Sequence, residues 1–173
     1  MYLFVFLQIL FASDYSRKEF KHWIDVDRDC QNTRHELLIE RSLIEVKFKD
    51  KKSCQVQFGK WNDFYFDEVM TSAKDVDIDH IVPLKHAWDS GAKYWNSSKK
   101  KIFANDPENL VLTNKKYNRQ KGAKTILEWM PIKRERACLY AKKWISVKEK
   151  YELSISKEEL NHIKLLNCEN LHH

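Results

Sequence analysis

Four polar residues of this chain have side chains suited to metal-assisted hydrolysis of a phosphodiester bond. Asp79 and His80 close a short run of alternating residues. Asn109 and Asn118 follow further along the chain, where the first can tie a loop. The carboxylate of Asp79 and the amide of Asn118 offer hard oxygen atoms, which suit Mg²⁺, Mn²⁺ or Ca²⁺ better than zinc. The imidazole of His80 can take a proton from an attacking water, so we interpret it as a general base.

Two short strands and a helix are expected to position these side chains. Residues 76–80 alternate as a strand does, and residues 110–112 form a second short strand. A helix follows, with Thr113 or Asn114 as its cap and Gly122 at its end. This order of elements would bring the polar residues to one place.

The alternation of a strand constrains the Asp79-His80 pair. Neighbouring side chains point to opposite faces, so both can face one phosphate only where the strand ends or bulges. Pro83 cannot donate a hydrogen bond to a neighbouring strand, and it makes an early strand end expected. The helix would then carry Asn118 toward Asp79. The alternative is a surface pair at a strand end, with both asparagines as ordinary turn and helix residues.

The remaining pattern predicts an α+β chain. Residues 46–58 alternate around a polar turn and indicate a hairpin, after which residues 59–61 leave the sheet. Apolar residues recur at helical spacing over 137–151. Ser156 with Glu159 forms a capping box that opens a last helix.

Length and composition describe one globular domain. The chain has 173 residues, of which 43% are hydrophobic and 32% are charged, with only 3 Gly and 3 Pro. This balance excludes disordered and fibrous proteins. No apolar run reaches the ~20 residues that span a bilayer. The net charge of +6 and the pI near 9.0 favour polyanionic partners.

The N-terminal segment has the character of a secretory leader. Residues 2–11 are almost entirely apolar, and two small residues follow them. This is about the length of the apolar part of a signal peptide. We therefore expect residues 1–12 to be a signal peptide and residues 13–173 to be the single domain of a secreted or periplasmic protein. A buried strand or helix at the N-terminus is the alternative.

Four cysteines stand at Cys30, Cys54, Cys138 and Cys168. They form no C-x-x-C pair, so a zinc site made of all four is not expected. An even number behind a leader favours disulfides. We predict the pairs Cys30–Cys54 and Cys138–Cys168, each closing a local loop worth about 3 kcal/mol in the chain-entropy model. Other pairings stay open, as do four free thiols in a cytosolic protein.

A basic segment surrounds Asn118. Five cations between positions 115 and 124 have no acidic residue among them. Arg119 and Lys121 closely follow Asn118, and we expect them to contact phosphates of a nucleic acid, which give affinity without sequence information. A solvated helix face is the alternative.

Together these motifs resemble the HNH endonucleases with the ββα-metal fold. The chain is most similar to the secreted HNH group related to the C-terminal domain of GmrSD-type restriction enzymes. The resemblance runs from about Trp23 to Cys168. Its strongest blocks are Asp77–Leu84, Trp88–Ala92, Phe103–Leu110, Asn118–Gly122, Glu128–Pro131 and Cys138–Tyr140.

The resemblance implies a role for each matching residue. His80 takes the place of the general base, and Asp79 takes that of the metal ligand beside it. Asn109 matches the residue that holds the loop and orients the base. Asn118 matches the last metal ligand, a position where many members carry His. The implied fold is α+β, with a ββα-metal core at about residues 76–122, a small antiparallel sheet and packed flanking helices.

The resemblance also implies a substrate and a further contact. Residues 30–34 resemble a Cys-Asp-Thr-Arg block with one residue added and the Asp missing, and Arg34 would reach the phosphate. The implied activity is cleavage of DNA with little sequence specificity, using Mg²⁺ or else Mn²⁺ or Ca²⁺, and RNA stays open as a substrate. An immunity or inhibitor protein is not visible in the sequence. A catalytically inactive DNA-binding module and a cytosolic restriction-type nuclease are the competing hypotheses.

Overall fold

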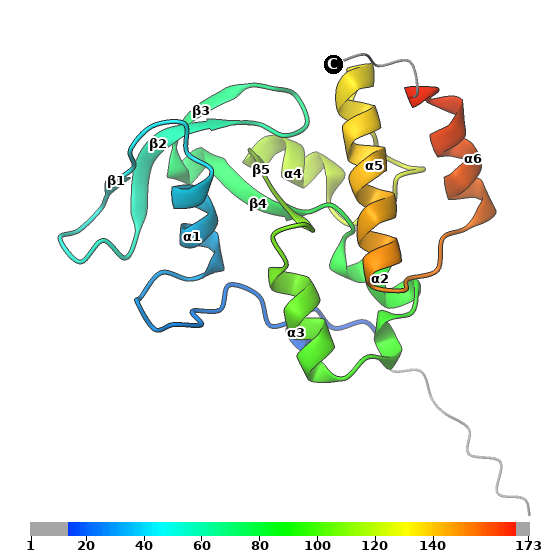
Figure 1. Ribbon diagram of the computed structural model, residues 1–173, viewed down its shortest axis with the longest axis horizontal. Helices are drawn as coiled ribbons and strands as arrows, with labels where there is room; N and C mark the ends of the chain where they lie inside the picture. Colours follow the sequence, from blue (N-terminus) through cyan, green and yellow to red (C-terminus); the bar gives the residue numbers. More distant parts are fainter. Residues whose placement is uncertain (1–13, 169–173) are drawn as a thin grey trace, which may run out of the picture.

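A computed structural model describes residues 14–168, so the expected signal peptide lies outside the described residues. The fold is α+β, as predicted, with helices around two small antiparallel sheets (Figure 1). Within the described residues, no helix combines the length and the apolar character that crossing a bilayer requires. In chain order the elements are η1 (Arg17–Glu19), α1 (Thr33–Glu40), β1 (Lys47–Phe48), β2 (Val56–Asn62), β3 (Val69–Ser72), η2 (Ala73–Asp75), β4 (Val76–His80), α2 (Leu84–Asp89), η3 (Ala92–Tyr94), α3 (Ser97–Asn105), β5 (Leu110–Asn114), α4 (Lys115–Lys121), α5 (Arg134–Lys150) and α6 (Lys157–Leu165).

Strands β4 and β5 form an antiparallel pair that leads directly into α4. Their register is regular from Val76 opposite Asn114 to His80 opposite Leu110, so the strand ends at His80 without a bulge. The side chain of Asn114 accepts a hydrogen bond from the Lys116 amide and caps α4. Gly122 ends the helix with a φ of 55°, which a residue without a Cβ adopts readily. The predicted strand, strand and helix are therefore present, with their predicted cap and stop.

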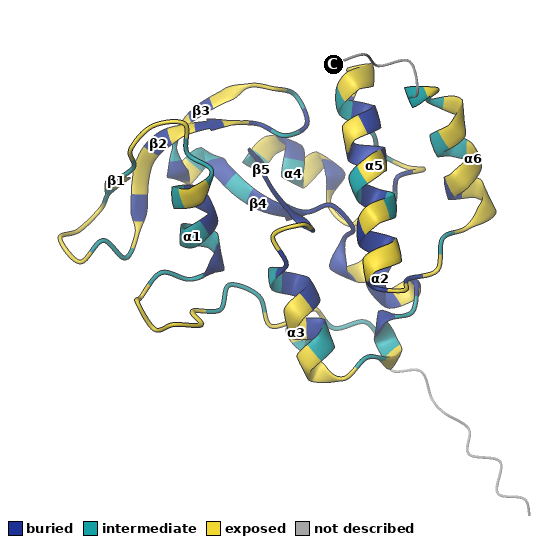
Figure 2. Ribbon diagram, viewed as in Figure 1, coloured by how far each residue is buried: buried dark blue, intermediate teal, exposed yellow. Residues whose placement is uncertain are grey.

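The β4–β5 pair is buried on both faces and separates two hydrophobic clusters (Figures 1 and 2). Because side chains alternate, His80 points to the same face as Ile78, and Asp79 points to the opposite one with Val111. The first face packs on α1 and the β1–β3 sheet through Val76, Ile78, Leu110, Leu112, Leu37, Leu38, Val56, Trp61 and Met70. The second cluster includes Val111, Tyr65, Tyr140, Ala141 and Trp144. The neighbours Asp79 and His80 thus stand in different surroundings.

The β1–β3 sheet corrects one prediction. Residues 59–61 do not leave the sheet, because β2 continues to Asn62 and pairs with β3 through an irregular register between Phe58 and Trp61. A Cβ added at Gly59 would lie 2.5 Å from the Trp61 ring, so only glycine leaves room for that indole. Trp61 is fully buried and donates a hydrogen bond to the Leu38 carbonyl. The glycine accommodates a core tryptophan and does not mark the end of the strand.

The connection between β4 and β5 is folded onto the core. It contains α2, η3 and α3, and its aromatic residues Trp88 and Phe103 are buried. Residue Ala104, at the end of α3, is also fully buried and faces the β4–β5 pair. The connection between β4 and β5 therefore covers one side of the His80 ring.

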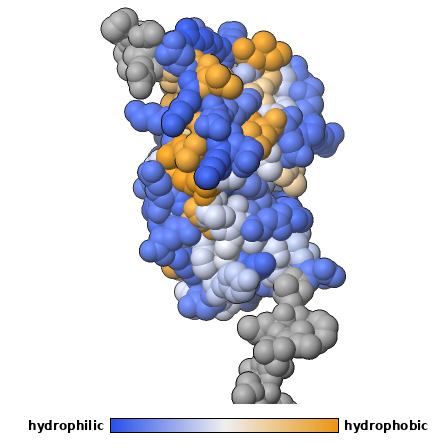
Figure 3. Space-filling view, turned by 90° about the vertical axis from the view of Figure 1, so that its right-hand side faces the viewer, coloured by the Kyte–Doolittle hydropathy of each residue, from blue (hydrophilic) through white to orange (hydrophobic). Residues whose placement is uncertain are grey.

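Helices α5 and α6 form the far side of the molecule. The predicted apolar stripe of α5 is buried, and the Ser156–Glu159 capping box opens α6 as predicted. A groove of about 520 Å³ is lined by Ala141, Ile145 and Ile163 together with both half-cystines of one disulfide. Figure 3 shows the apolar side chains of this face among charged ones. The disulfide fastens the end of α6 to α5.

Both disulfides have the predicted pairing. Cys30–Cys54 joins the loop before α1 to the turn that precedes β2, across a separation of 24 residues. Cys138–Cys168 joins α5 to the chain after α6, across 30 residues. The described residues contain no free cysteine.

Removing the second disulfide should destabilise the protein measurably. The double variant Cys138→Ser with Cys168→Ser should lose about 3 kcal/mol of unfolding free energy, because the unfolded chain regains the freedom of the open loop. Urea unfolding of oxidised wild type and of the variant measures the difference. Equal unfolding midpoints in the two proteins would contradict this expectation.

Candidate active site

A cleft of about 510 Å³ lies along the edge of β4 that has no strand partner among the described residues. Its walls come from the segment before η1, from β4, from the start of α2 and from α4 with the residues after it. The lining residues are Tyr15, Arg17, Ile78, Asp79, His80, Pro83, Leu84, Lys85, Asn118, Arg119, Gly122 and Ala123. The predicted base, both predicted metal ligands and one predicted phosphate contact therefore meet in one cleft.

Asp79 is held through one carboxylate oxygen. Its Oδ2 accepts a hydrogen bond from the Tyr65 hydroxyl at 2.6 Å and pairs with the Lys121 ammonium at 2.9 Å. Burial, followed by the charge of Asp79, raises the pKa of Tyr65 well above its ordinary value, so the phenol stays a hydrogen-bond donor. Within residues 14–168, Oδ1 has no hydrogen-bond partner. It is the oxygen of Asp79 that remains for a ligand in the cleft.

His80 is buried and held in one tautomer. Its Nε2 lies 2.9 Å from the carbonyl oxygen of Ala104, which can only accept, so Nε2 carries the hydrogen. The ring stacks on Trp23 with centroids 6.2 Å apart. Burial lowers the pKa of His80 to about 3, the charges of Arg17 and Lys121 act in the same direction, and the bond to Ala104 opposes them. The neutral imidazole therefore keeps the lone pair of Nδ1 available to accept a proton.

The lowered pKa of His80 predicts how stability depends on pH without metal. Above its ordinary value of 6.5 the imidazole is neutral in both folded and unfolded chains. Below pH 6.5 the His80 imidazole of the unfolded chain takes up a proton, whereas that of the folded protein stays neutral down to about pH 3. The free energy of unfolding therefore falls as the pH falls through this range. The slope contributed by one such group is at most about 1.4 kcal/mol per pH unit.

Urea unfolding in EDTA across this pH range would measure the effect. A His80→Asn variant supplies the control, because it lacks the titrating group. Wild type should lose stability more steeply than this variant between about pH 6 and about pH 4. Parallel curves for the two proteins would show that His80 is not the buried neutral group described here.

Asn109 ties the loop after β4 to the loop before β5. Its Oδ1 accepts a hydrogen bond from the Val82 amide at 2.9 Å, and its carbonyl accepts one from the Ile81 amide at 2.8 Å. The residue is fully buried and does not line the cleft. The His80 ring is oriented by the hydrogen bond that its Nε2 donates to the Ala104 carbonyl, so Asn109 acts only on the backbone just after the base.

Asn118 has a fixed amide orientation. Its Nδ2 donates to Oδ2 of Asp77 at 3.0 Å, and a carboxylate can only accept, so the nitrogen must face Asp77. The amide oxygen has no hydrogen-bond partner among the described residues. Asn118 is half-buried and lines the cleft. Sequence reasoning assigned no role to Asp77, although it shares a strand face with Asp79.

Three cations line the cleft and differ in their availability. Lys85 forms an ion pair with Asp89 at 2.5 Å. Arg17 and Arg119 are exposed and have no ion-pair partner within the described part of the chain. Arg119 stands where the sequence predicted a phosphate contact. Arg17 and Lys85 were not predicted, because they come from segments that only the tertiary fold brings to β4.

Lys121 and Arg34 are not placed as predicted. The prediction that Lys121 contacts nucleic acid is wrong, because its side chain is fully buried and bonds to Asp79 and to the His80 carbonyl. It lies three positions after Asn118, on the same face of α4, so a helix that turns Asn118 inward turns Lys121 inward too. Arg34 does not line the cleft, and it donates to the Val76 carbonyl at the opposite end of β4.

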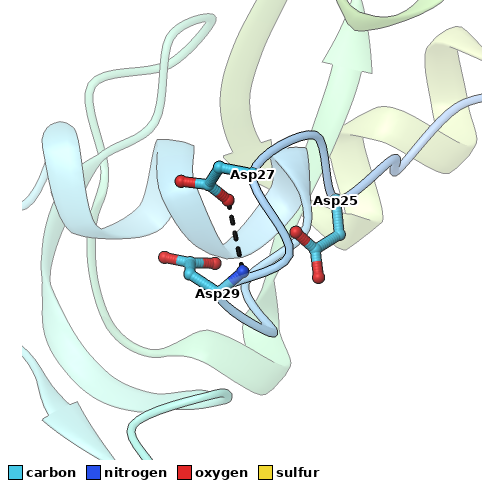
Figure 4. A group of neighbouring side chains, drawn as sticks. All are labelled: Asp25, Asp27 and Asp29. Carbon is cyan, nitrogen blue, oxygen red and sulfur yellow. Dashed lines mark hydrogen bonds between the residues drawn. The ribbon is translucent and has the colours of Figure 1, made fainter.

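Three exposed carboxylates gather in the loop before α1 (Figure 4). The oxygens of Asp25, Asp27 and Asp29 lie within 4.8 Å of one another. Each carboxylate accepts hydrogen bonds from backbone amides of the same loop, such as those of Arg28 and Cys30 on Asp25. None of the three lines the cleft. Their hydrogen bonds account for the turn that precedes Cys30.

The residues of the cleft fit a hard divalent cation. Asp79 and Asn118 each have one oxygen without a protein hydrogen bond, and both side chains line the same cavity. Carboxylate and amide oxygens are the ligands that Mg²⁺, Mn²⁺ and Ca²⁺ prefer. The volume of the cleft leaves room for water and phosphate oxygens around such an ion.

Comparison with known proteins places this architecture in a family. The family described as GmrSD restriction endonucleases, C-terminal domain, matches residues 33–163, which contain all of β4, β5 and α4. An uncharacterized secreted protein of Arthroderma benhamiae is 40% identical over 147 residues, which are 84% of this chain and 70% of that protein. No solved structure matches the chain. This chain belongs to the family of the C-terminal domain of GmrSD restriction endonucleases.

Proposed function

We propose that this protein is a metal-dependent HNH endonuclease that hydrolyses phosphodiester bonds in DNA. The observation that carries the proposal is the meeting of Asp79, His80 and Asn118 in one cleft, from a strand, strand and helix in the order of a ββα-metal centre. Membership of a restriction-endonuclease family supports the same reaction class.

The base of the reaction is Nδ1 of His80. The Ala104 carbonyl holds the hydrogen on Nε2, so Nδ1 can accept the proton of a water that attacks phosphorus. A divalent cation held by Asp79 and Asn118 would stabilise the charge that develops on the scissile phosphate and the leaving oxygen. A pKa of about 3 makes the His80 imidazole a weak base when no substrate is bound. The negative charge of a bound phosphate raises the pKa of His80, whereas the positive charge of a divalent cation on Asp79 lowers it.

The cationic side chains of the cleft suit a nucleic-acid backbone. Arg17 and Arg119 are exposed beside the base and the helix ligand, without competing ion pairs among the described residues. Phosphate contacts position a strand without reading its bases. We therefore propose low sequence specificity and salt-sensitive binding.

We further propose that the protein acts outside the cell. Two disulfides tie its loops and helices together, and disulfides persist in oxidising compartments. The relative from Arthroderma benhamiae bears the name of a secreted protein. Sequencing the N-terminus of protein recovered from culture medium tests this, with a start near Ser13 expected. Intact, cytosolic protein beginning at Met1 would favour the restriction-type alternative.

A plasmid-cleavage assay tests the central proposal. Oxidised protein should nick and then degrade supercoiled DNA with Mg²⁺ or Mn²⁺, and EDTA should stop it. Asp79→Ala should abolish metal-dependent cleavage, whereas Asp75→Ala, an acidic residue outside the cleft, should not. A parallel RNA substrate decides between the two nucleic acids. Salt-sensitive binding by folded protein without cleavage in any metal would overturn the proposal and favour a binding module.

A further inference from the structure

We propose that Lys121, Tyr65 and Asp77 are positioning residues that leave each metal ligand a single oxygen facing the cleft. The inference rests on the proposed function, because it takes Asp79 and Asn118 as the ligands. It assigns a task to three residues that sequence reasoning either misplaced or left without a role.

Asp79, the metal ligand on β4, has only one carboxylate oxygen available for a metal. Oδ2 of Asp79 already has two donors, the Tyr65 hydroxyl at 2.6 Å and the Lys121 ammonium at 2.9 Å. Both donors are fully buried, so neither can swing aside into solvent when an ion binds. Bidentate coordination by Asp79 would require breaking these bonds, so the carboxylate can offer only Oδ1.

Asn118, the metal ligand on α4, has its side-chain amide held in one orientation. An asparagine amide can bind a cation only through its oxygen, and a free amide can turn either way. Asp77 removes that freedom, because its carboxylate accepts the hydrogen of Asn118 Nδ2 at 3.0 Å. The amide oxygen of Asn118 is therefore oriented before a metal arrives, as outer partners of metal ligands commonly arrange.

Two pairs of residues connect β4 to α4. Asp77 and Asp79 are two positions apart and share a strand face, and Asn118 and Lys121 are three apart and share a helix face. The contacts match them in order, Asp77 with Asn118 and Asp79 with Lys121. In the first pair the helix residue, Asn118, is the metal ligand. In the second pair the strand residue, Asp79, is the metal ligand. Lys121 also donates to the His80 carbonyl at 2.8 Å, which ties the backbone of the base to the same anchor.

Mn²⁺ binding, followed by electron paramagnetic resonance on the oxidised full chain, tests the helix side. Asp77→Asn should weaken binding by about 10–100-fold, because the amide of Asn118 is no longer held in one orientation. Glu68→Gln is the matched control, since it makes the same chemical change at a carboxylate that contacts α4 away from the ligands. It should bind Mn²⁺ as wild type does.

An exchange variant separates orientation from general structural damage. Asp77→Asn combined with Asn118→Asp keeps the hydrogen bond with its direction reversed, and the carboxylate at position 118 presents an oxygen whichever way it turns. This variant should recover Mn²⁺ binding to within about tenfold of wild type. Binding as weak as in Asp77→Asn alone would overturn the orientation argument.

Lys121→Met tests the strand side through metal preference. Removing one of the two donors to Oδ2 of Asp79 makes bidentate coordination by this carboxylate easier, and Ca²⁺ accepts a bidentate carboxylate whereas the strict octahedron of Mg²⁺ does not. The ratio of Ca²⁺ to Mg²⁺ affinity, from calorimetry, should rise about tenfold. Tyr65→Phe frees the same oxygen from one donor and should shift the ratio in the same direction, so it replaces Lys121→Met if that variant does not fold.

The outcomes distinguish the inference from the function on which it rests. Wild type that neither binds Mn²⁺ nor cleaves DNA would overturn both. Suppose instead that wild type binds Mn²⁺ and cleaves DNA. The positioning roles alone would then be overturned if Asp77→Asn bound Mn²⁺ as tightly as wild type and Lys121→Met left the ratio of Ca²⁺ to Mg²⁺ affinity unchanged. Thermal melting of each variant without metal shows that the comparison is made between folded proteins.

Discussion

Replacing His80 by alanine should lower the rate of DNA cleavage by about 10²–10⁴-fold, the contribution typical of a general base. The substitution removes Nδ1, the nitrogen that the bond from Nε2 to Ala104 leaves available. It leaves Asp79, Asn118 and the exposed arginines of the cleft in place, so DNA binding and Mn²⁺ binding should persist. Single-turnover cleavage at saturating Mg²⁺, with DNA binding measured in Ca²⁺ or EDTA, separates chemistry from affinity.

His22→Ala is the control for this experiment. His22 is a half-buried histidine that packs beside Trp23, the residue on which His80 stacks, but it does not line the cleft. Its loss should change the cleavage rate by far less. Activity retained in His80→Ala, or lost equally in both variants, would remove His80 as the base.

Replacing Lys148 by methionine should lower the free energy of unfolding by about 3–5 kcal/mol, because it leaves a buried carboxylate without its counter-ion. Lys148 is fully buried, and its ammonium lies 2.8 and 2.9 Å from the two carboxylate oxygens of Glu159. Burial opposes ionisation of Glu159, but hydrogen bonds from His86, Lys148 and the Ser156 amide outweigh it and lower its pKa to about 2. Glu159 therefore carries a charge that needs its partner at neutral pH.

Chemical denaturation of wild type and variant measures this loss. Lys85→Met is the control, because Lys85 pairs with Asp89 and the side chains of both residues are exposed. Its loss should cost no more than about 1 kcal/mol. The double variant Lys148→Met with Glu159→Gln should lose less than the two single losses added together. A Lys148→Met protein as stable as Lys85→Met would show that the buried pair of Lys148 and Glu159 contributes no more to stability than an exposed pair.

Much of the scaffold could be predicted because local chemistry decides it. Asn114 can cap a helix and Gly122 can end one by virtue of their own side chains, so α4 was predicted with its cap and its stop. The alternation of residues 76–80 predicted β4 in the same way. Gly59 shows the limit of such reasoning, since its reason for being glycine is the Trp61 ring that packs over it.

The cleft required more than local pattern. Asp79 and His80 were expected to face one phosphate only where the strand ends or bulges, and β4 ends at His80 without a bulge. Both reach the cleft because that edge of β4 has no neighbouring strand in the described chain. Which edge stays open depends on how distant elements pack, and neighbouring residues in the sequence do not record it.

The sequence by itself determined which chemical groups are present and which short elements carry them, whereas it left alternatives to the predicted cysteine pairs open. Only the tertiary structure decided which charges are buried and which face the cleft. Lys121 and Arg119 are both cations on α4, yet one lies inside against Asp79 and the other is exposed. The difference arises because a helix turns about 100° per residue, so a sheet packed on one face buries one cation and leaves the other in solvent.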